Sequence, residues 1–339
     1  MRKFYNLLII WKIWYNVYEG KDNMMKCVVI YNPNSGKLTN RNDVKKLYKI
    51  FENYGYDVEI IYTEYKGHAK EITKKLKDVD LLICAGGDGT LNEVISGNIE
   101  RHKPILLGHL PLGSVNDVAH MYGMTGNTTK NLVMLLNGAQ KNIDVCLING
   151  NPFVYVACIG AWVDISYSTP RKLKEKYGKL AYVIYGIQQL KQKLQFYNVK
   201  YTVNGEQREG RFSFIFITNS NRVGGVDNIY DDVKLDDNKF EVLLCEIKNK
   251  WDILRAVHYL KRRELDDIPV FKYFKTDKIE LEFDEMPPSW CIDGDELTHE
   301  TNKFKIEINK DNYMLLPTKN IDKLFERPEE TEEELDEEI

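Results

Sequence analysis

Residues 83–94 read ICAGGDGTLNEV, and this stretch places three glycines and one aspartate where a strand-like apolar run meets a helix-like segment. The glycines at positions 86, 87 and 89 let the backbone approach a ligand closely, and the helix that follows directs its N–H groups and positive dipole end to the same place. The stretch therefore predicts a phosphate-binding loop. Because Asp88 would repel a phosphate unless a divalent cation lay between them, it also predicts a magnesium-bridged nucleotide. A glycine turn required only for packing is the alternative.

The segments around this loop predict a parallel sheet. Four short apolar runs, KCVVIYNP, DVEIIYT, DLLICAGG and PILLGHLP, are separated by stretches of helical character such as 41–54 and 67–78. Strands that alternate with helices indicate a parallel sheet covered on both faces. Two further polar loops, YNPNSGK at 31–37 and PLGSVND at 111–117, follow other strands of this set. Ligands bind beyond the carboxyl ends of such strands, so we expect the three loops to meet at one crevice.

The second half of the chain has a different pattern. Longer strands such as RFSFIFITNS, KFEVLLCEI and KIELEF follow, with turns at Asn204-Gly205 and Asp293-Gly294. The fold class predicted is therefore α/β, with a parallel-sheet N-terminal domain and a mostly antiparallel C-terminal domain. We expect the first, nucleotide-binding domain at 26–145, with segment 312–325 packing back on it, and the second domain at 146–311.

Composition and charge set the general class. The chain has 339 residues, 43% hydrophobic and 29% charged, which suits two globular domains. The six cysteines show no CxxC spacing, so we expect reduced thiols and a cytoplasmic protein. Residues 326–339 carry nine acids and one arginine, which predicts a disordered acidic tail and leaves the remainder positive although the whole chain has a net charge of -4.

The first 25 residues are treated as an N-terminal extension. Their apolar patch is interrupted by Lys12 and is shorter than the ~20 residues that a membrane-spanning helix needs. One hypothesis is an upstream extension ahead of a start at Met24 or Met25, and the other is an interfacial helix with Trp11 and Trp14 at headgroup level.

Taken in order, NPNSGK, GGDGTLNE, PLGSVNDVA and WCIDGDE resemble the diacylglycerol kinase catalytic-domain family, over residues 26–318. This family includes soluble bacterial-type lipid kinases and is similar to sphingosine and ceramide kinases. The resemblance implies an ATP- and Mg²⁺-dependent kinase that phosphorylates a lipid hydroxyl, with diacylglycerol giving phosphatidic acid. It implies that the first domain is Rossmann-like and that the second is a β-sandwich that accepts the lipid. It also implies peripheral contact with a membrane that holds the lipid substrate, and it leaves room for a homodimer.

The resemblance assigns nucleotide contacts to residues in four loops. They are Asn32, Pro33, Asn34, Ser35, Gly36, Thr63, Gly87, Asp88, Gly89, Thr90, Leu91, Asn92, Glu93 and Ser114. Thr63 taken by itself would be an ordinary strand-end residue, and Asn116 and Asp117 are either a helix cap or ligand-orienting residues. Lys37, Asp144 and Lys179 match a charge cluster of the family, although each alone is typical of a solvated surface.

Two acidic sites in the second half follow from the same resemblance. In DDVKLDDNKFEV, Asp237 with the carbonyls of Lys234 and Lys239 is expected to bind a structural magnesium, and a plain acidic turn is the alternative. The family's glycine is replaced there by Asn238, which tolerates left-handed conformations. In IDGDE the catalytic base is expected at Asp295, where the family has glutamate, with Glu296 as a substitute.

The remaining hypotheses concern partners and other activities. Segments 171–197 and 248–263 mix basic residues with tyrosine, leucine or tryptophan, and they predict either contact with an anionic membrane or ordinary core packing with solvated lysines. Nucleic acid is not expected as a partner, because no recognition module is present. A catalytically weak lipid- or nucleotide-binding protein and an NAD kinase are the alternative functions.

Overall fold

The computed structural model describes residues 24–35, 41–113, 115–124, 126–160, 195–223, 226–227, 230, 233–262, 268–318 and 321–326. The chain divides into two compact units. Unit 1 ends at Ile143 and resumes at Asp311, and unit 2 is Asp144–Lys310. Two strands, β5 (Ala139–Ile148) and β18 (Lys303–Leu316), run from one unit into the other.

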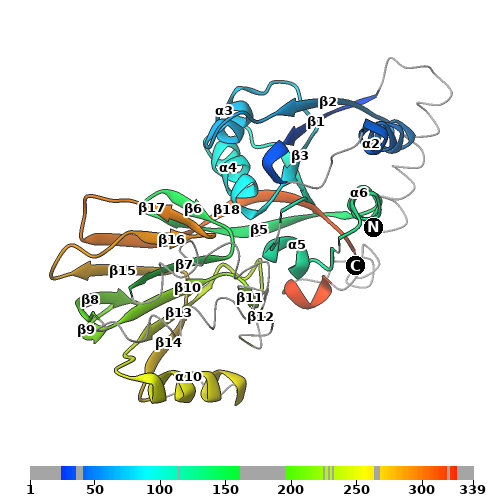
Figure 1. The fold of residues 1–339 in the computed structure, drawn as a ribbon. Helices are drawn as coiled ribbons and strands as arrows, with labels where there is room; N and C mark the ends of the chain where they lie inside the picture. Colours follow the sequence, from blue (N-terminus) through cyan, green and yellow to red (C-terminus); the bar gives the residue numbers. More distant parts are fainter. Residues whose placement is uncertain are drawn as a thin grey trace, which may run out of the picture. The chain divides into compact units, whose positions relative to one another are not determined.

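Unit 1 is built on parallel strands (Figure 1). These are β1 (Met25–Tyr31), β2 (Tyr56–Tyr62), β3 (Leu81–Gly86) and β4 (Leu106–Pro111). They lie in the order β2-β1-β3-β4, every neighbouring pair is parallel, and β18 joins beyond β4 with Met314 opposite Leu107. The chain leaves β1 toward β2 and later continues from β3 toward β4, so the sheet has its topological switch point between β1 and β3.

Helices cover both faces of this sheet. The helical elements of unit 1 are η2 (Pro33–Ser35), α2 (Arg41–Asn53), α3 (His68–Lys75), α4 (Asp88–Ile99), α5 (Asp117–Met121), α6 (Thr128–Leu136) and η3 (Asp322–Leu324). Phe51 of α2 and Leu132 of α6 pack in one cluster with Val29 of β1, while the alternate residue Ile30 is buried on the opposite face. Burial on both faces explains why β1 and β3 are continuous apolar runs, whereas the edge strand β2 mixes apolar and charged residues.

Unit 2 is antiparallel. Its strands are β6 (Asn151–Phe153), β7 (Val156–Gly160), β8 (Tyr197–Val203), β9 (Glu206–Phe212), β10 (Phe214–Thr218), β11 (Arg222–Val223), β12 (Val226–Asp227), β13 (Phe240–Cys245), β14 (Phe271–Thr276), β15 (Lys278–Phe283), β16 (Trp290–Ile292) and β17 (Asp295–Leu297), and its described helix is α10 (Lys250–Arg262). One sheet has the order β14-β13-β10-β7-β16-β17, and in the other β18 continues through β15 and β8 to β9.

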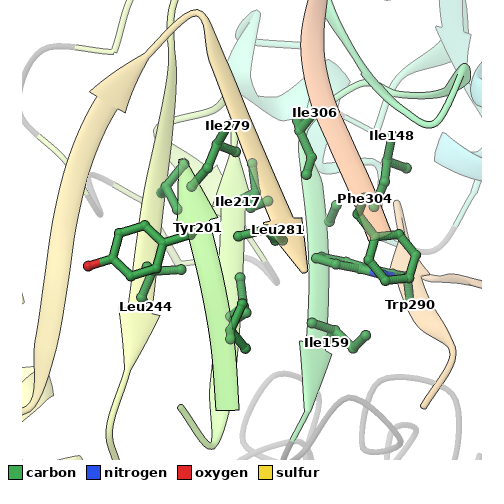
Figure 2. Close-up of a cluster of buried hydrophobic side chains, with 14 of the residues drawn as sticks. Ile148, Ile159, Tyr201, Ile217, Leu244, Ile279, Leu281, Trp290, Phe304 and Ile306 are labelled. Carbon is green, nitrogen blue, oxygen red and sulfur yellow. The ribbon is translucent and has the colours of Figure 1, made fainter. Parts of the chain in front are cut away.

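The core of unit 2 lies between these two sheets. Figure 2 shows Tyr201 and Leu281 of one sheet beside Ile217 and Leu244 of the other, and all belong to one cluster of buried side chains. Trp290 packs on Phe304 with 5.3 Å between ring centroids. Side chains from two facing sheets that fill one core make a β-sandwich. The predicted fold class, a Rossmann-like parallel domain followed by a mostly antiparallel sandwich, is confirmed.

The sequence predicted neither a membrane-spanning helix nor a disulfide bond. Among the described residues, no helix is long and apolar enough to cross a bilayer. All six cysteines are described, and none of them forms a disulfide. Residues 1–23 and 327–339, on which the expected extension and most of the acidic tail fall, lie outside the described residues. The domain limits stay a prediction.

Candidate active site

Four loops of unit 1 follow the carboxyl ends of the four parallel strands. They begin at Asn32 after β1, Thr63 after β2, Gly87 after β3 and Leu112 after β4. Most of the nucleotide contacts predicted from the sequence fall on these loops and on the first turns of α4. Since neighbouring parallel strands end at one edge of the sheet, the topology places these loops at a common edge, as expected for a ligand site.

Asn32 ties the first loop to the third. Its main-chain N–H donates to the carbonyl of Ala85 over 3.0 Å, and its side-chain amide donates to the Thr90 hydroxyl over 2.9 Å. Its own side-chain oxygen accepts the N–H of Asn34. These bonds join the carboxyl end of β1 to the start of α4 across the topological switch point. Pro33 to Ser35 form the short helix η2 beside them, with Pro33 and Asn34 exposed.

The second loop is held by Glu93. The two carboxylate oxygens of Glu93 accept the main-chain N–H groups of Gly67 over 2.8 Å and Ala69 over 3.2 Å. Glu93 thus caps the N-terminus of α3 from the second turn of α4. Thr63 is buried, and its N–H donates to the carbonyl of Tyr31. The structure therefore gives Glu93 a scaffolding role that the sequence did not indicate.

The third and fourth loops touch through their glycines. A Cβ atom on Gly113 would lie 2.7 Å from the Cα of Gly87, and a Cβ on Gly86 would lie 2.6 Å from the Cβ of Thr90. The N–H of Leu112 donates to the carbonyl of Gly86 over 2.8 Å. Packing alone thus requires glycine at these positions, as the alternative interpretation held. The same contacts bring the backbone of the fourth loop close to Gly87, the N-cap of α4, which as a glycine has no side chain of its own to accept the first N–H groups.

An N-terminus without a side-chain cap suits an anionic ligand. α4 is a 12-residue helix, so its first turn carries a concentrated positive end of the helix dipole. Thr90 and Leu91 are buried within the helix, while Asp88 and Gly89 are partly exposed beside the cap. Main-chain N–H groups here can bind phosphate oxygens, and the hydroxyl of Thr90 accepts an N–H of Asn32 while its own O–H is a further donor.

Asp88 binds the fourth loop. Its Oδ2 accepts the N–H of Asp117 over 2.9 Å and its Oδ1 accepts that of Val118 over 3.4 Å, at the N-terminus of α5. Asn116 occupies the N-cap position in a left-handed conformation with φ 51°, and its side chain donates to the Gly113 carbonyl instead of capping the helix. Asn116 thus occupies the N-cap position of α5, as the helix-cap hypothesis states. The carboxylate that accepts the first N–H groups of this helix belongs to Asp88 instead.

His109 contacts the glycine loop from the neighbouring strand β4. It lies wholly buried in β4, with 3.2 Å between its Nε2 and the carbonyl oxygen of Gly86. Burial lowers the pKa of His109 to about 4, although the Gly86 carbonyl acts in the opposite direction. The imidazole is therefore neutral at physiological pH, and its Nε2–H donates to Gly86. The sequence signal for this supporting role was a histidine within the apolar run PILLGHLP, and His109 was not singled out from the sequence.

In unit 2, the IDGDE segment forms the β16–β17 hairpin. Asp293 and Gly294 make its turn, with φ 50° and 89°. The buried carboxylate of Asp293 accepts the N–H groups of Val154 over 2.7 Å, Tyr155 over 3.0 Å and Val156 over 3.1 Å. Asp293 was predicted only as a turn residue, yet it fastens the hairpin to the chain before β7.

Asp295 and Glu296 follow this turn and are both exposed. Asp295 pairs with Ile292, and Glu296 pairs with Cys291. Because paired residues project to the same face and successive residues to opposite faces, the two acids lie on different faces of the hairpin. Asp295 shares the face of Ile292, which belongs to the sandwich core, and Glu296 shares the other.

The acidic turn before β13 contains an ion pair. Asp237 Oδ2 lies 2.8 Å from the Nζ of Lys275, and Asp237 Oδ1 accepts the N–H of Lys239 over 3.0 Å. Asn238 has φ 58°, so it takes the left-handed conformation for which the family's glycine is suited. Lys275 was not found from the sequence, because it lies on β14 and no local pattern connects it to the turn.

Two further carboxylates lie close to this turn. Glu241 approaches the same Lys275 ammonium at 4.0 Å, and the Asp144 carboxylate accepts the N–H of Asn238 over 2.6 Å. Burial, followed by the nearby charges of Asp237 and Asp236, raises the pKa of Asp144 to about 6. The main cause is burial, which disfavours the charged carboxylate, and the two neighbouring aspartates add to it.

Some predicted residues fall outside the described part of the chain. Gly36, Lys37, Ser114 and Lys179 are among them. Within the described residues, no group of three or more His, Cys, Asp or Glu side chains could by itself hold a metal ion. A magnesium bound by one carboxylate, main-chain carbonyls and water is a different kind of site.

Together, these features define a two-domain α/β protein with a glycine loop at the switch point of its parallel sheet. Residues 26–148 match the family described as the diacylglycerol kinase catalytic domain, and residues 163–309 match the YegS C-terminal NAD kinase beta sandwich-like domain. The diacylglycerol kinase of Bacillus subtilis (strain 168) is 30% identical over 266 residues, which cover 77% of this chain and 87% of that protein. The diacylglycerol kinase of Staphylococcus aureus (strain JH9) is 32% identical over 75% of this chain and 81% of its own.

The chain belongs to the diacylglycerol kinase family and is a lipid kinase. The fold agrees with this assignment. The crystal structure of a diacylglycerol kinase from Bacillus anthracis str. Sterne superposes with a TM-score of 0.67 at 22% identity, over 87% of this chain and 98% of that one.

Proposed function

We propose that this enzyme transfers the γ-phosphate of ATP to the hydroxyl group of diacylglycerol, giving phosphatidic acid, and that it requires Mg²⁺. The observation that carries the proposal is the set of four loops at the carboxyl ends of β1 to β4. These loops are tied to one another by Asn32, Glu93 and Asp88, and they surround an α4 N-terminus without a side-chain cap. The names of the two curated relatives support diacylglycerol as the acceptor.

In this proposal the nucleotide phosphates bind at α4. The N–H groups at Gly87 to Thr90 contact phosphate oxygens, and the loop that begins at Asn32 lies at the same edge of the sheet. Thr63 and Ser114 contribute from the loops after β2 and β4. Preorganised donors of this kind stabilise charge on the transferring phosphoryl group.

Asp88 can bind a magnesium ion without giving up its bonds to α5. Each of its carboxylate oxygens accepts one N–H group from Asp117 or Val118, and an ionised carboxylate has about four acceptor positions in all. The position therefore fits a cation. When bound, magnesium would neutralise charge on the nucleotide phosphates.

A second magnesium is proposed at the acidic turn, where Asp237 and the carbonyls of Lys234 and Lys239 would bind it. The two carboxylates of Asp237 and Glu241 that share the Lys275 ammonium support a cation there. This ion would have a structural role in unit 2.

Asp295 is proposed as the general base that accepts the proton of the lipid hydroxyl. A base must reach that hydroxyl within hydrogen-bonding distance, and the exposed position of Asp295 directly after a fixed turn leaves its carboxylate accessible. We place the enzyme in the cytoplasm and expect peripheral contact with the membrane that holds its substrate.

The proposal is tested by incubating the purified protein with radiolabelled ATP and a panel of lipids that contains diacylglycerol, ceramide and sphingosine, together with NAD. We expect label in phosphatidic acid, lost on chelation of Mg²⁺, and no label from Asp295→Ala above background. Label in NAD or only in a sphingolipid would refute the proposed acceptor. ATP binding without transfer to any acceptor would instead favour the binding-protein alternative.

A further inference from the structure

Helix α10 of unit 2 has a firmly fixed start. The side chain of Asn249 accepts the N–H groups of Trp251 over 2.8 Å and Asp252 over 3.3 Å. In return, the carboxylate of Asp252 accepts the N–H groups of Lys248 over 2.9 Å and Asn249 over 3.2 Å. This reciprocal arrangement is a capping box, which satisfies the donors at a helix N-terminus. The orientation of the first turn, including Trp251, is therefore set by local bonds.

One face of α10 is used for packing. Asp252 is 5% exposed, and Ala256 and Tyr259 pack against the cluster of Val270, Phe271 and their neighbours. These three residues are spaced four and three apart, so they lie on one side of the helix. Core packing, one of the two alternatives given for segment 248–263, is therefore correct for this side of α10.

The other face has a different composition. Trp251, Arg255, His258 and Arg262 are all exposed, and their spacing of four, three and four residues places them in one narrow stripe. We call these four residues the docking face. Trp251 is 62% exposed, more than any other large hydrophobic side chain in the described part of the chain. The capping box fixes the first turn of α10, where the ring of Trp251 is exposed to solvent beside two arginines and a histidine.

We propose that the docking face binds a membrane surface containing anionic phospholipid, with α10 lying flat on it, Trp251 at headgroup level and the arginines on lipid phosphates. This inference rests on the proposed function, since a lipid kinase must reach a substrate that resides in a bilayer. Tryptophan prefers the membrane interface because its ring is apolar and its N–H is polar. Arginines beside it match the negative charge of the leaflet.

Arg255 and Arg262 differ in their position relative to the capping box. Arg255 lies 3.3 Å from the carboxylate of Asp252, so part of its charge is compensated within the helix. Arg262 is the last residue of α10, so its substitution leaves the capping box at the other end of the helix intact. Arg262 and Trp251 are therefore the residues whose substitution tests docking with least risk to the fold.

The test measures binding of the full chain to vesicles by sedimentation, without ATP or diacylglycerol. Vesicles of phosphatidylcholine are compared with vesicles that also contain phosphatidylglycerol. We expect the wild type to bind the anionic vesicles and to be released by salt. Arg262→Gln should lower the partition coefficient about fivefold, since one basic residue near the surface contributes about that factor. Trp251→Ala should lower it by about tenfold, because the exposed ring no longer inserts.

Matched controls use exposed residues of unit 2 away from the docking face. Lys272→Gln removes one exposed positive charge, and Met286→Ala removes an exposed apolar side chain of 57% exposure. Both should bind vesicles as the wild type does. The proposal is overturned if the Trp251 and Arg262 variants bind like the wild type, or if the controls lose as much binding as they do. Because binding is measured without turnover, the result stands whichever lipid the enzyme phosphorylates.

An activity measurement completes the experiment. On diacylglycerol in anionic vesicles, Trp251→Ala should lose activity in proportion to its lost binding. On a short-chain diacylglycerol dispersed in solution it should match the wild type. Equal loss on both substrates would mean that Trp251 acts in catalysis or folding, which contradicts the docking role.

Discussion

The carboxylate of Asp88 accepts the main-chain N–H of Asp117, with 2.9 Å between Oδ2 and N, although 29 residues separate the two in the chain. This bond makes the aspartate of the glycine loop the cap of the following short helix. Asp88 therefore has a structural partner within unit 1 in addition to the magnesium proposed for it. The two roles respond differently to substitution.

Asp88→Asn keeps an oxygen that can accept the Asp117 N–H but removes the charge needed for magnesium. We expect a loss of turnover on the order of 10² or more with a nearly unchanged Tm. Asp88→Ala should lose turnover equally and also about 1 kcal/mol of unfolding free energy, the usual effect of deleting a helix cap. Steady-state kinetics and thermal unfolding of both variants test this. Near wild-type turnover of Asp88→Asn would remove the magnesium assignment.

Asp295→Ala should reduce turnover by the ~10² to 10⁴ typical of a lost general base, and Glu296→Ala should change it little. The paired register of the β16–β17 hairpin supports this contrast, since the two acids lie on opposite faces. Asp295→Glu restores the family's side chain and should keep or raise activity. The measurement is the rate on the lipid that the wild type phosphorylates. Full activity of both alanine variants would place the base elsewhere.

Asp293→Ala should affect stability, in contrast to Asp295→Ala. The substitution leaves the N–H groups of Val154, Tyr155 and Val156 without their carboxylate acceptor in a buried place. We expect a loss of about 3 kcal/mol or more in urea unfolding, whereas Asp295→Ala should unfold like the wild type. Asp293→Asn, which retains one acceptor oxygen, should fall between them. Equal stability of the three variants would contradict the anchoring role.

Chelation should distinguish the two cations that can neutralise the acidic turn. If magnesium binds at Asp237, EDTA should lower the Tm of the wild type and have little effect on Asp237→Ala. Lys275→Met removes the ammonium that lies 2.8 Å from Asp237, so its Tm should depend on magnesium more strongly than that of the wild type. If EDTA leaves the wild type unchanged while Lys275→Met is destabilised, Lys275 alone is the counter-ion and the magnesium proposal is wrong.

Acidification should expose the role of His109. Its pKa is about 4 in the folded protein and lies near 6.5 in an unfolded chain, so between these values the unfolded state binds more protons. The unfolding free energy should therefore fall as pH drops through this window, by up to about 3 kcal/mol from this residue. His109→Gln should lose less on the same change of pH, measured by urea unfolding. An identical loss in both proteins would show that His109 is not responsible.

Much of the fold follows from local pattern. Strands β1 and β3 are continuously apolar because both of their faces are buried, whereas β2 at the edge of the sheet has only half-buried and exposed residues. The order of these runs and of the helical segments between them predicted a parallel sheet. The longer strands after residue 145 likewise predicted an antiparallel second domain, and the resemblance to the family implied that this domain is a sandwich. The positions of Asn32, Gly87 and Asp88 at strand ends predicted the edge at which they lie, since parallel topology brings those ends together.

The sequence by itself determined the fold class, the family and the strand ends that carry polar loops, because each depends on a repeat or motif within a few residues. Only the tertiary structure decided that Asp88 caps α5, that Asp293 binds three N–H groups more than 135 residues away, and that Lys275 faces Asp237. The same holds for the exposed stripe of α10, whose basic residues and tryptophan the sequence could not divide between core and solvent. A long-range hydrogen bond or a buried face depends on where distant segments pack, and no local spacing contains that information.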